Sequence, residues 1–470
     1  MHDLLTLTLT ELRDRLHARK ASPVELMQAV LARIDETNPD LNAVCSRRDP
    51  DACLADARES EARIARGEAR PLEGIPLGVK ELEEAAGLPH TEASMLFKDR
   101  VATQDSIQVE RLKAAGAIVV AKTNAPEFGA PAFTKNRVYG VTRSPWNLEL
   151  TPGGSSGGSS AAMAAGVIPL VTAGDGGGSI RIPASFTGCF GLKPSWGRVA
   201  REHGDQWEYG CTAVYGPLTK TVEDAALFMD QVVGADARDP HSLPHPGYFY
   251  VERVAAGMPE KLRIGFSPDL GYAVVQSDVA AAVADGVRVF ETLGHRIEPI
   301  SGGPPELGRA WGLLGSFLMA SRLDGHLAGR EELLGRGLLA GVRMADDMSP
   351  ALFANLARAR DKLNVWAADV FSKVDLLVTP TVPFDPYEAP GPYPTETEGR
   401  PQPWSNVGSF TIPFNLSWHP AASVRVGLSK AGLPMGMQIV GPRHRDDLVL
   451  QAARAFERER PWHPHWPLRW

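Results

Sequence analysis

The chain has 470 residues, of which 43% are hydrophobic and 22% are charged, and its formal net charge is -7. This composition is typical of a globular protein, and the length alone allows two or three domains. The negative balance provides no basic field, so neither nucleic acid nor an anionic membrane surface is expected as a partner.

Three helices without assigned chemistry are predicted near the N-terminus. Residues 8–11 read Thr-Leu-Thr-Glu and form a capping box, and residues 22–25 form a second one with proline in the first helical position. Apolar residues then recur at helical spacing over residues 24–37. An alanine- and arginine-rich surface helix is expected over residues 51–68.

An apolar strand is predicted over residues 74–80, and it ends in Lys80. A lone lysine is most often solvated at the protein surface. Here the lysine follows Ile75, Leu77 and Val79, which favour an interior position. Burial disfavours the charged form of a lysine and lowers its pKa, so Lys80 is a candidate base near neutral pH.

A parallel crossover is expected next. Asp105 or Ser106 caps a predicted helix over residues 107–115, and residues 117–121 read as a buried strand. Strand, helix and strand at this spacing are typical of a crossover unit. Residues 122–128 are interpreted as structural or as a pocket wall.

The stretch from Thr151 to Gly191 carries the strongest chemical signal. Two glycine–serine clusters, residues 153–160 and 174–179, flank a small and apolar segment. The pattern predicts a loop, a short helix, a strand, a second loop and a helix. Successive backbone N–H groups in a glycine-rich loop can hold an anion. With Ser179 at its end, the second loop suits a nucleophile beside its own oxyanion hole.

Other readings of this stretch fit less well. A flexible linker does not need the embedded apolar and helix-prone residues, and no nucleotide-binding glycine pattern is present. Residues 153–157 match Gly-x-Ser-x-Gly, but a nucleophile elbow requires a strand that runs directly into the serine. Pro152 argues against such a strand.

Residues 201–215 show little periodicity, and they could edge a pocket or form a surface excursion. They contain His203, Asp205, Trp207, Glu208 and Tyr209.

Helices and strands are also predicted further along the chain. They are a helix from Thr219 or Thr221 to Val233, an irregular connection over 236–260, a strand over 262–266, a helix over 279–293, a mostly helical region over 306–372, a strand over 374–379, a proline-rich loop over 380–403, a strand over 432–441 and a helix over 447–457.

The glycine–serine stretch resembles the signature of the amidase signature family of serine hydrolases. The matching segments are residues 153–159, 175–183 and 188–195, and the likeness extends over about 5–235 and 405–457. One departure is Ala173-Gly174, where the family usually has glycine and then serine or threonine.

The resemblance implies an α/β fold with a mixed, mostly parallel central sheet covered by helices on both faces. It implies one amidase domain over residues 1–470. The core signature region would span about 70–235, the divergent helical middle about 300–372, and the C-terminal return 405–457.

The resemblance also implies a catalytic triad of Lys80, Ser155 and Ser179. The family's lysine stands in Gly-Val-Lys-Asp, and this chain has Glu81 in place of the aspartate. Ser155 matches the bridging serine, which the family holds in a cis peptide, and its neighbour Ser156 is the rival position. Ser179 matches the nucleophile.

Further roles are expected around Ser179. The backbone N–H groups of Gly176, Gly177, Gly178 and Ser179 would stabilise the oxyanion. Asp175 and Arg181 would pair to hold the loop.

The function implied is cleavage of the C–N bond of a small carboxamide, aryl acylamide, hydrazide or cyclic amide through an acyl-Ser179 intermediate. The partners would be the small-molecule amide and water, with no cofactor or metal, and a homodimer stays open. Two alternatives remain, the A subunit of a glutamine-dependent tRNA amidotransferase and a non-catalytic binding protein on the same fold.

Compartment and metal content are judged from the cysteines, the histidines and the N-terminus. The four cysteines contain no Cys-x-x-Cys pair, which predicts reduced thiols rather than disulfides or a zinc site. No signal peptide and no membrane span of about 18 apolar residues is recognised, so a cytoplasmic protein is expected. No histidine lies in a motif tied to a serine, and His463 and His465 form only a weak metal candidate.

Overall fold

A computed structural model describes residues 2–202, 211–403, 406–462 and 466–467. The predicted loop residues His203, Asp205, Trp207, Glu208 and Tyr209, and the histidines at 463 and 465, lie outside the described residues.

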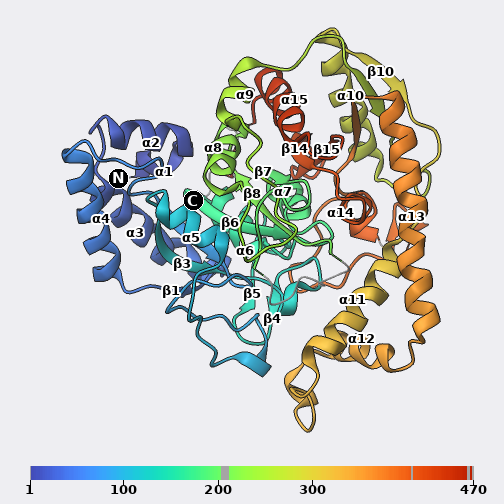
Figure 1. Ribbon diagram of the computed structural model, residues 1–470, viewed down its shortest axis with the longest axis horizontal. Helices are drawn as coiled ribbons and strands as arrows, with labels where there is room; N and C mark the ends of the chain where they lie inside the picture. The colour runs from blue at the N-terminus through green and yellow to red at the C-terminus, as the bar shows by residue number, and fades with distance from the viewer. Residues whose placement is uncertain (1, 203–210, 404–405, 463–465, 468–470) are drawn as a thin grey trace.

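Within the described residues, one sheet of eleven strands forms the centre of the molecule (Figure 1). Its spatial order is β1 (Val44–Arg47), β3 (Ile118–Thr123), β2 (Pro76–Lys80), β6 (Leu170–Asp175), β8 (Val214–Thr219), β7 (Phe190–Lys193), β14 (Ala421–Leu428), β15 (Pro434–Val440), β11 (Leu376–Pro380), β9 (Arg263–Phe266) and β10 (Arg296–Pro299). The C-terminal strands β14 and β15 lie between β7 and β11, so both ends of the chain contribute to one sheet.

The sheet is mixed, as expected, but its parallel pairs fall into two groups. Strands β3, β2 and β6 are parallel to one another, and so are β11, β9 and β10. The other neighbouring pairs, which join β1 to β3 and connect β6 to β11, are antiparallel. The parallel character expected for most of the sheet is thus confined to these two groups. The returning hairpin of β14 and β15 accounts for part of this difference, because a short connection joins antiparallel strands.

Helices cover both faces of the sheet, as expected. Successive residues of a strand point to opposite faces. In β15, Met437 packs against Gly286 of helix α10 (Ser277–Thr292), whereas Gly436 packs against Ser185 of helix α7 (Arg181–Thr187). Helices α7 and α10 therefore lie on opposite sides of the sheet.

The N-terminal helices form a group at one edge of the molecule, drawn in blue in Figure 1. Helix α1 (His2–Thr6) comes first, and both capping boxes are present, at the start of α2 (Leu9–His17) and of α3 (Pro23–Leu41). Helix α3 runs past its predicted end and includes Pro39. Helix α4 (Pro50–Ala65) matches the predicted surface helix.

The crossover that positions Lys80 is confirmed. Strand β2 pairs with β3 in parallel, with Leu77 opposite Val119, and α5 (Ile107–Ala114) connects them. The helix is capped by Ser106, whose side chain accepts from Val109 N–H. All five residues of β2 are buried, which places Lys80 in the interior.

The glycine–serine stretch folds in the predicted order. A loop leads into helix α6 (Gly157–Ala164), strand β6 follows, and a second loop leads into α7. Pro169 stands just before β6 and does not interrupt it. No strand precedes Ser155 within the described residues 142–154, consistent with the rejection of a nucleophile elbow.

Downstream, α8 (Val222–Val232) is capped by Thr221, and the C-terminal helix α15 (Asp446–Glu459) matches its prediction. Helix α9 (Tyr250–Ala256), β10 and β14 were not predicted. Strand β10 reads Arg-Ile-Glu-Pro and is partly exposed at the sheet edge, so it has no apolar pattern.

The middle of the chain is helical, as predicted. Helices α11 (Gly308–Leu323) and α12 (Arg336–Asp346) pack together, and α13 (Pro350–Lys373) runs beside them (Figure 1). The predicted proline-rich loop contains only the short strands β12 (Glu396–Thr397) and β13 (Arg400–Pro401). None of the described helices has the length and apolar character needed to cross a membrane.

The remaining short elements are 3-10 turns at Met95–Phe97, Glu127–Gly129, Glu331–Leu333 and Asn406–Gly408, the strands β4 (Lys135–Asn136) and β5 (Gly140–Val141), and helix α14 (Ile412–Leu416).

Candidate active site

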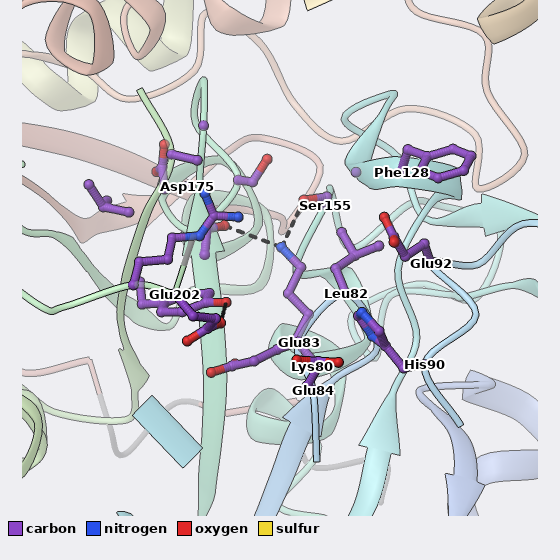
Figure 2. A pocket seen from close by; sticks show the side chains of 18 of the residues that line it. Lys80, Leu82, Glu83, Glu84, His90, Glu92, Phe128, Ser155, Asp175 and Glu202 are labelled. Atoms are coloured by element: carbon purple, nitrogen blue, oxygen red, sulfur yellow. Dashed lines mark hydrogen bonds between the residues drawn. The ribbon is translucent and has the colours of Figure 1, made fainter. Parts of the chain in front are cut away.

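A cavity of about 680 Å³ lies beside the ends of β2 and β6 and the loop that follows β6. Lys80, Ser155 and Ser179 all line it, although they come from three separate segments of the chain. Figure 2 shows Lys80 and Ser155 turned toward each other inside this cavity, with Asp175 nearby. The fold therefore gathers the three predicted triad residues at one place.

Lys80 is held at both its backbone and its side chain. It is only 4% exposed, and its backbone N–H donates to Thr172 Oγ1 on the neighbouring strand β6 at 2.9 Å. Its Nζ lies within hydrogen-bonding distance of Ser155 Oγ at 2.8 Å, Ser156 Oγ at 2.9 Å and Gly174 O at 3.2 Å. The terminal nitrogen is therefore directed at the serine pair.

The two serines differ in what they face. Ser155 lines the cavity and follows a cis peptide bond at Gly154, as the resemblance implied for the bridging position. Ser156 is fully buried, is not a lining residue, and directs its hydroxyl to Gly174 O at 3.3 Å. Both contact Lys80, but only Ser155 also faces the space where a substrate would bind.

Ser179 is half-buried and lines the cavity. Its carbonyl oxygen accepts from Ser156 N–H at 3.2 Å, which ties its backbone to the start of α6. Its hydroxyl has no hydrogen-bond partner among the described residues, so Ser155 and Ser179 are not joined directly in this structure.

Asp175 organises the loop that precedes Ser179. Its Oδ1 accepts from Gly178 N–H at 2.7 Å, and its Oδ2 accepts from Ile180 N–H at 3.1 Å. The loop backbone thus wraps around one carboxylate, as it does in an anion-binding nest.

The prediction that Gly178 is an oxyanion donor is corrected by this geometry, because its single backbone proton is already bound to Asp175. The N–H groups of Gly176, Gly177 and Ser179 have no partner within the part of the chain that the structure describes. For these three groups the oxyanion role stays a prediction.

The expected pairing of Asp175 with Arg181 is present, and both side chains are fully buried. Arg181 Nη2 and Nε donate to the two carboxylate oxygens at 3.0 Å each. The same guanidinium donates to Gln438 Oε1 at 2.7 Å and also to Asn415 Oδ1. Asn415 Nδ2 in turn donates to Asp175 Oδ1 at 2.8 Å.

Burial by itself would raise the pKa of Asp175, but the guanidinium of Arg181 and the amide of Asn415 outweigh it and hold that pKa well below its usual range. Asp175 is therefore ionised under all ordinary conditions.

Asn415 and Gln438 were not singled out from the sequence. The available signal was their position in the two C-terminal segments that resemble the family, residues 410–417 and 432–441. Their polar side chains are almost fully buried, which is costly unless they are hydrogen-bonded.

His90 also lines the cavity and was not identified from the sequence. Its ring Nδ1 lies 3.2 Å from Glu81 O. Burial lowers the pKa of His90 to about 3, with Lys122 and Arg100 acting in the same direction. The imidazole is therefore uncharged at neutral pH.

The cavity wall carries both acidic and basic side chains. Besides this neutral histidine, five basic and five acidic side chains of the described residues line it. They are Lys80, Arg100, Arg201, Arg238 and Arg322, and Glu83, Glu84, Glu92, Asp175 and Glu202. Glu92 pairs with both Arg100 and Arg322.

Among the described residues, no group of three or more histidine, cysteine, aspartate or glutamate side chains is arranged to hold a metal ion. The four cysteines are free thiols.

Comparisons with known proteins agree with the sequence resemblance. The family model described as Amidase matches residues 25–450. The A subunit of a glutamyl-tRNA(Gln) amidotransferase from Geotalea daltonii is 33% identical over 98% of this chain and 99% of its own. An acylamidase from Rhodococcus erythropolis is 34% identical over 97% of this chain and 96% of its own.

Among solved structures, a bacterial aryl acylamidase of the amidase signature enzymes superimposes with a TM-score of 0.91 at 29% identity. The superposition covers 98% of this chain and 97% of the acylamidase.

Proposed function

The chain belongs to the amidase signature family, and we propose that it hydrolyses the C–N bond of a small carboxamide-type substrate through an acyl-enzyme on Ser179. The observation that carries the proposal is the contact of buried Lys80 Nζ with Ser155 Oγ, at 2.8 Å, inside the cavity that Ser179 also lines. The similarity to an acylamidase and to an aryl acylamidase supports amide substrates.

In the proposed reaction, neutral Lys80 accepts a proton from Ser155 as Ser155 accepts the proton of Ser179. Ser179 Oγ then attacks the carbonyl carbon of the amide. The negative charge that develops on the carbonyl oxygen is stabilised by the N–H groups of Gly176, Gly177 and Ser179.

Collapse of the tetrahedral intermediate breaks the C–N bond. Ser155 returns a proton to the leaving nitrogen, and Lys80 restores the proton of Ser155. Water, deprotonated through the same pair, then attacks the ester carbon of acyl-Ser179. The bond between that carbon and Ser179 Oγ breaks, Ser155 returns the proton to Ser179 Oγ, and the carboxylic acid is released. No cofactor takes part in this scheme.

The substrate class we propose is uncharged. Both acidic and basic side chains line the cavity, so a charged ligand would gain from one set and be opposed by the other. Leu82, Phe128 and Trp311 add apolar surface to the wall. Carboxamides, aryl acylamides, hydrazides and cyclic amides meet both conditions.

A role as the A subunit of a tRNA amidotransferase is the second candidate, favoured by the 33% identity to such a protein. A free chain that hydrolyses small amides without added subunits would argue against it. Glutamine hydrolysis that requires added subunits would favour it.

The test of the proposal is a hydrolysis panel of these amides together with labelling by a serine-reactive fluorophosphonate. Ser179→Ala is expected to abolish labelling and to lower turnover by on the order of 10³-fold or more. Ser160→Ala is the matched control, because Ser160 is buried in the same stretch and donates to Pro152 O rather than lining the cavity. Normal turnover by Ser179→Ala would overturn the assignment of the nucleophile.

A further inference from the structure

Trp311 joins the divergent middle of the chain to the loop before Ser179. It lies in the first turn of α11, and its indole Nε1 donates to Gly176 O at 3.1 Å. The same ring packs against the neighbouring glycine, because a Cβ placed on Gly177 would lie 2.5 Å from Trp311 Cζ2. Trp311 also lines the cavity.

The start of α11 is anchored, so the indole is held in place. Trp311 packs on a buried apolar cluster formed by α11, α13 and α14, whose buried members are Leu307, Leu363, Ile412 and Leu416. Its backbone N–H donates to Leu307 O at 2.8 Å. Movement of the ring away from Gly176 would require this cluster to repack.

The hydrogen bond has a consequence for the next residue. The Gly176–Gly177 peptide is trans, and in a planar trans peptide the C=O and the following N–H point in opposite directions. Because the indole holds Gly176 O, it also directs Gly177 N–H away from itself. That N–H has no partner among the described residues.

The next peptide of the loop is also held at its carbonyl oxygen by a side chain, but its N–H group is bound as well. Thr411 Oγ1 donates to Gly177 O at 2.7 Å, and the N–H of that peptide, on Gly178, donates to Asp175 Oδ1. One peptide is therefore locked into the loop's internal network, whereas the other keeps its N–H for a ligand.

We propose that Trp311 is a positioning residue that orients Gly177 N–H as an oxyanion donor for the amide. The inference rests on the proposed function, since an oxyanion forms only if Ser179 attacks a carbonyl carbon. Helix α11 lies in the segment where the chain departs from the family. Through Trp311, this helix would help to support the reacting centre.

The competing role for Trp311 is a simple cavity wall. A wall contributes equally to substrate and transition state, so its loss raises KM and leaves kcat unchanged. Loss of an oriented oxyanion donor lowers kcat, and complete removal of one such donor costs about 10²- to 10³-fold. Misorientation of a donor is expected to cost less, about tenfold.

The experiment removes the indole N–H and keeps the ring. Trp311 is replaced by β-(3-benzothienyl)alanine, in which sulfur stands for the N–H group, and a second variant is Trp311→Phe. The same two replacements at Trp146 are the controls, because Trp146 Nε1 donates to a backbone oxygen, Thr187 O, at 2.8 Å and the residue does not line the cavity. Each protein is assayed for kcat, KM and the affinity of an arylboronic acid, which forms a tetrahedral adduct with a nucleophilic serine.

Both Trp311 replacements are expected to lower kcat and boronic acid affinity by about tenfold, with KM within twofold of the unmodified protein. The Trp146 replacements are expected to leave both kcat and the boronic acid affinity unchanged. An increase in KM alone, or a boronic acid affinity that does not change, would overturn the positioning role. If the unmodified protein forms no boronate or fluorophosphonate adduct at Ser179, the proposed function fails instead, so the two failures are distinguishable.

Discussion

Replacement of Asp175 by asparagine is the sharpest perturbation of the loop before Ser179. The carboxylate accepts from the backbone N–H groups of Gly178, Ile180 and Arg181, and also from the amide of Asn415 and two guanidinium nitrogens of Arg181. Asparagine retains the shape but turns one oxygen into an NH₂ donor, which would face other donors. It also leaves the guanidinium of Arg181, which is fully buried, without its counter-charge.

The expected loss of unfolding free energy in Asp175→Asn is large. Removal of one partner of a buried ion pair destabilises a protein by about 3–5 kcal/mol, because the remaining charge stays desolvated and unpaired. Total unfolding free energies are only about 5–15 kcal/mol, so Asp175→Asn should have a clearly lowered midpoint of urea denaturation.

The pH dependence gives a second signature. Because the folded state lowers the pKa of Asp175, its contribution to stability is present above the unfolded value of about 4 and is lost as the pH falls toward the folded value. Asp175→Asn should lose this part of the acid sensitivity.

Asp446→Asn is the matched control. Asp446 is also fully buried, lies 3.4 Å from Arg198 Nε and accepts from Ser195 N–H, but neither member of the pair lines the cavity. We expect both variants to be destabilised. Under conditions where both are folded, only Asp175→Asn should label slowly with fluorophosphonate. This account of the loop would be refuted if the unfolding free energy of Asp175→Asn lay within about 1 kcal/mol of that of the unmodified protein, or if the variant labelled at the normal rate.

Three further outcomes are expected. Lys80→Arg should label with fluorophosphonate far more slowly than the unmodified protein, because a guanidinium stays protonated and cannot act as the base. Near-normal labelling of this variant would point to another base such as His90. Ser155→Ala should slow acylation far more than Ser156→Ala, because only Ser155 faces the cavity, and the reverse ranking would exchange their roles. Burial raises the pKa of Glu81 to about 7. The stability linked to its protonated form is therefore present below about pH 4.5 and lost as the pH rises through 7. The unfolding free energy should fall by on the order of 3 kcal/mol over this range. Urea denaturation of Glu81→Gln at several pH values should lack this fall.

The parts of the fold that follow from local patterns could be predicted. The two capping boxes, the strand that ends in Lys80 and the element order from Thr151 to Gly191 each depend on residues close in sequence. The same holds for the candidate nucleophile, because the glycine loop and Ser179 are adjacent. The family resemblance supplied the link between Lys80 and Ser155, which lie 75 positions apart.

The parts of the fold that depend on contacts between residues far apart in sequence could not be predicted. Arg181 donates to Gln438 across 257 positions, and Trp311 donates to Gly176 across 135. The occupation of Gly178 N–H was missed for a different reason. It is decided by the turn of the loop around Asp175, and a run of glycines does not specify which peptide points inward.

These contacts divide the support of the loop before Ser179 between two kinds of segment. Asn415 and Gln438 come from segments that resemble the family, and they hold the loop through Asp175 and Arg181. The indole of Trp311 comes from the divergent middle and holds the peptide between Gly176 and Gly177. Because the ring also lines the cavity, a change in α11 can alter the donor geometry and the shape of the substrate space together. We therefore expect substitutions in α11 to change selectivity and rate together while Lys80, Ser155 and Ser179 stay unchanged.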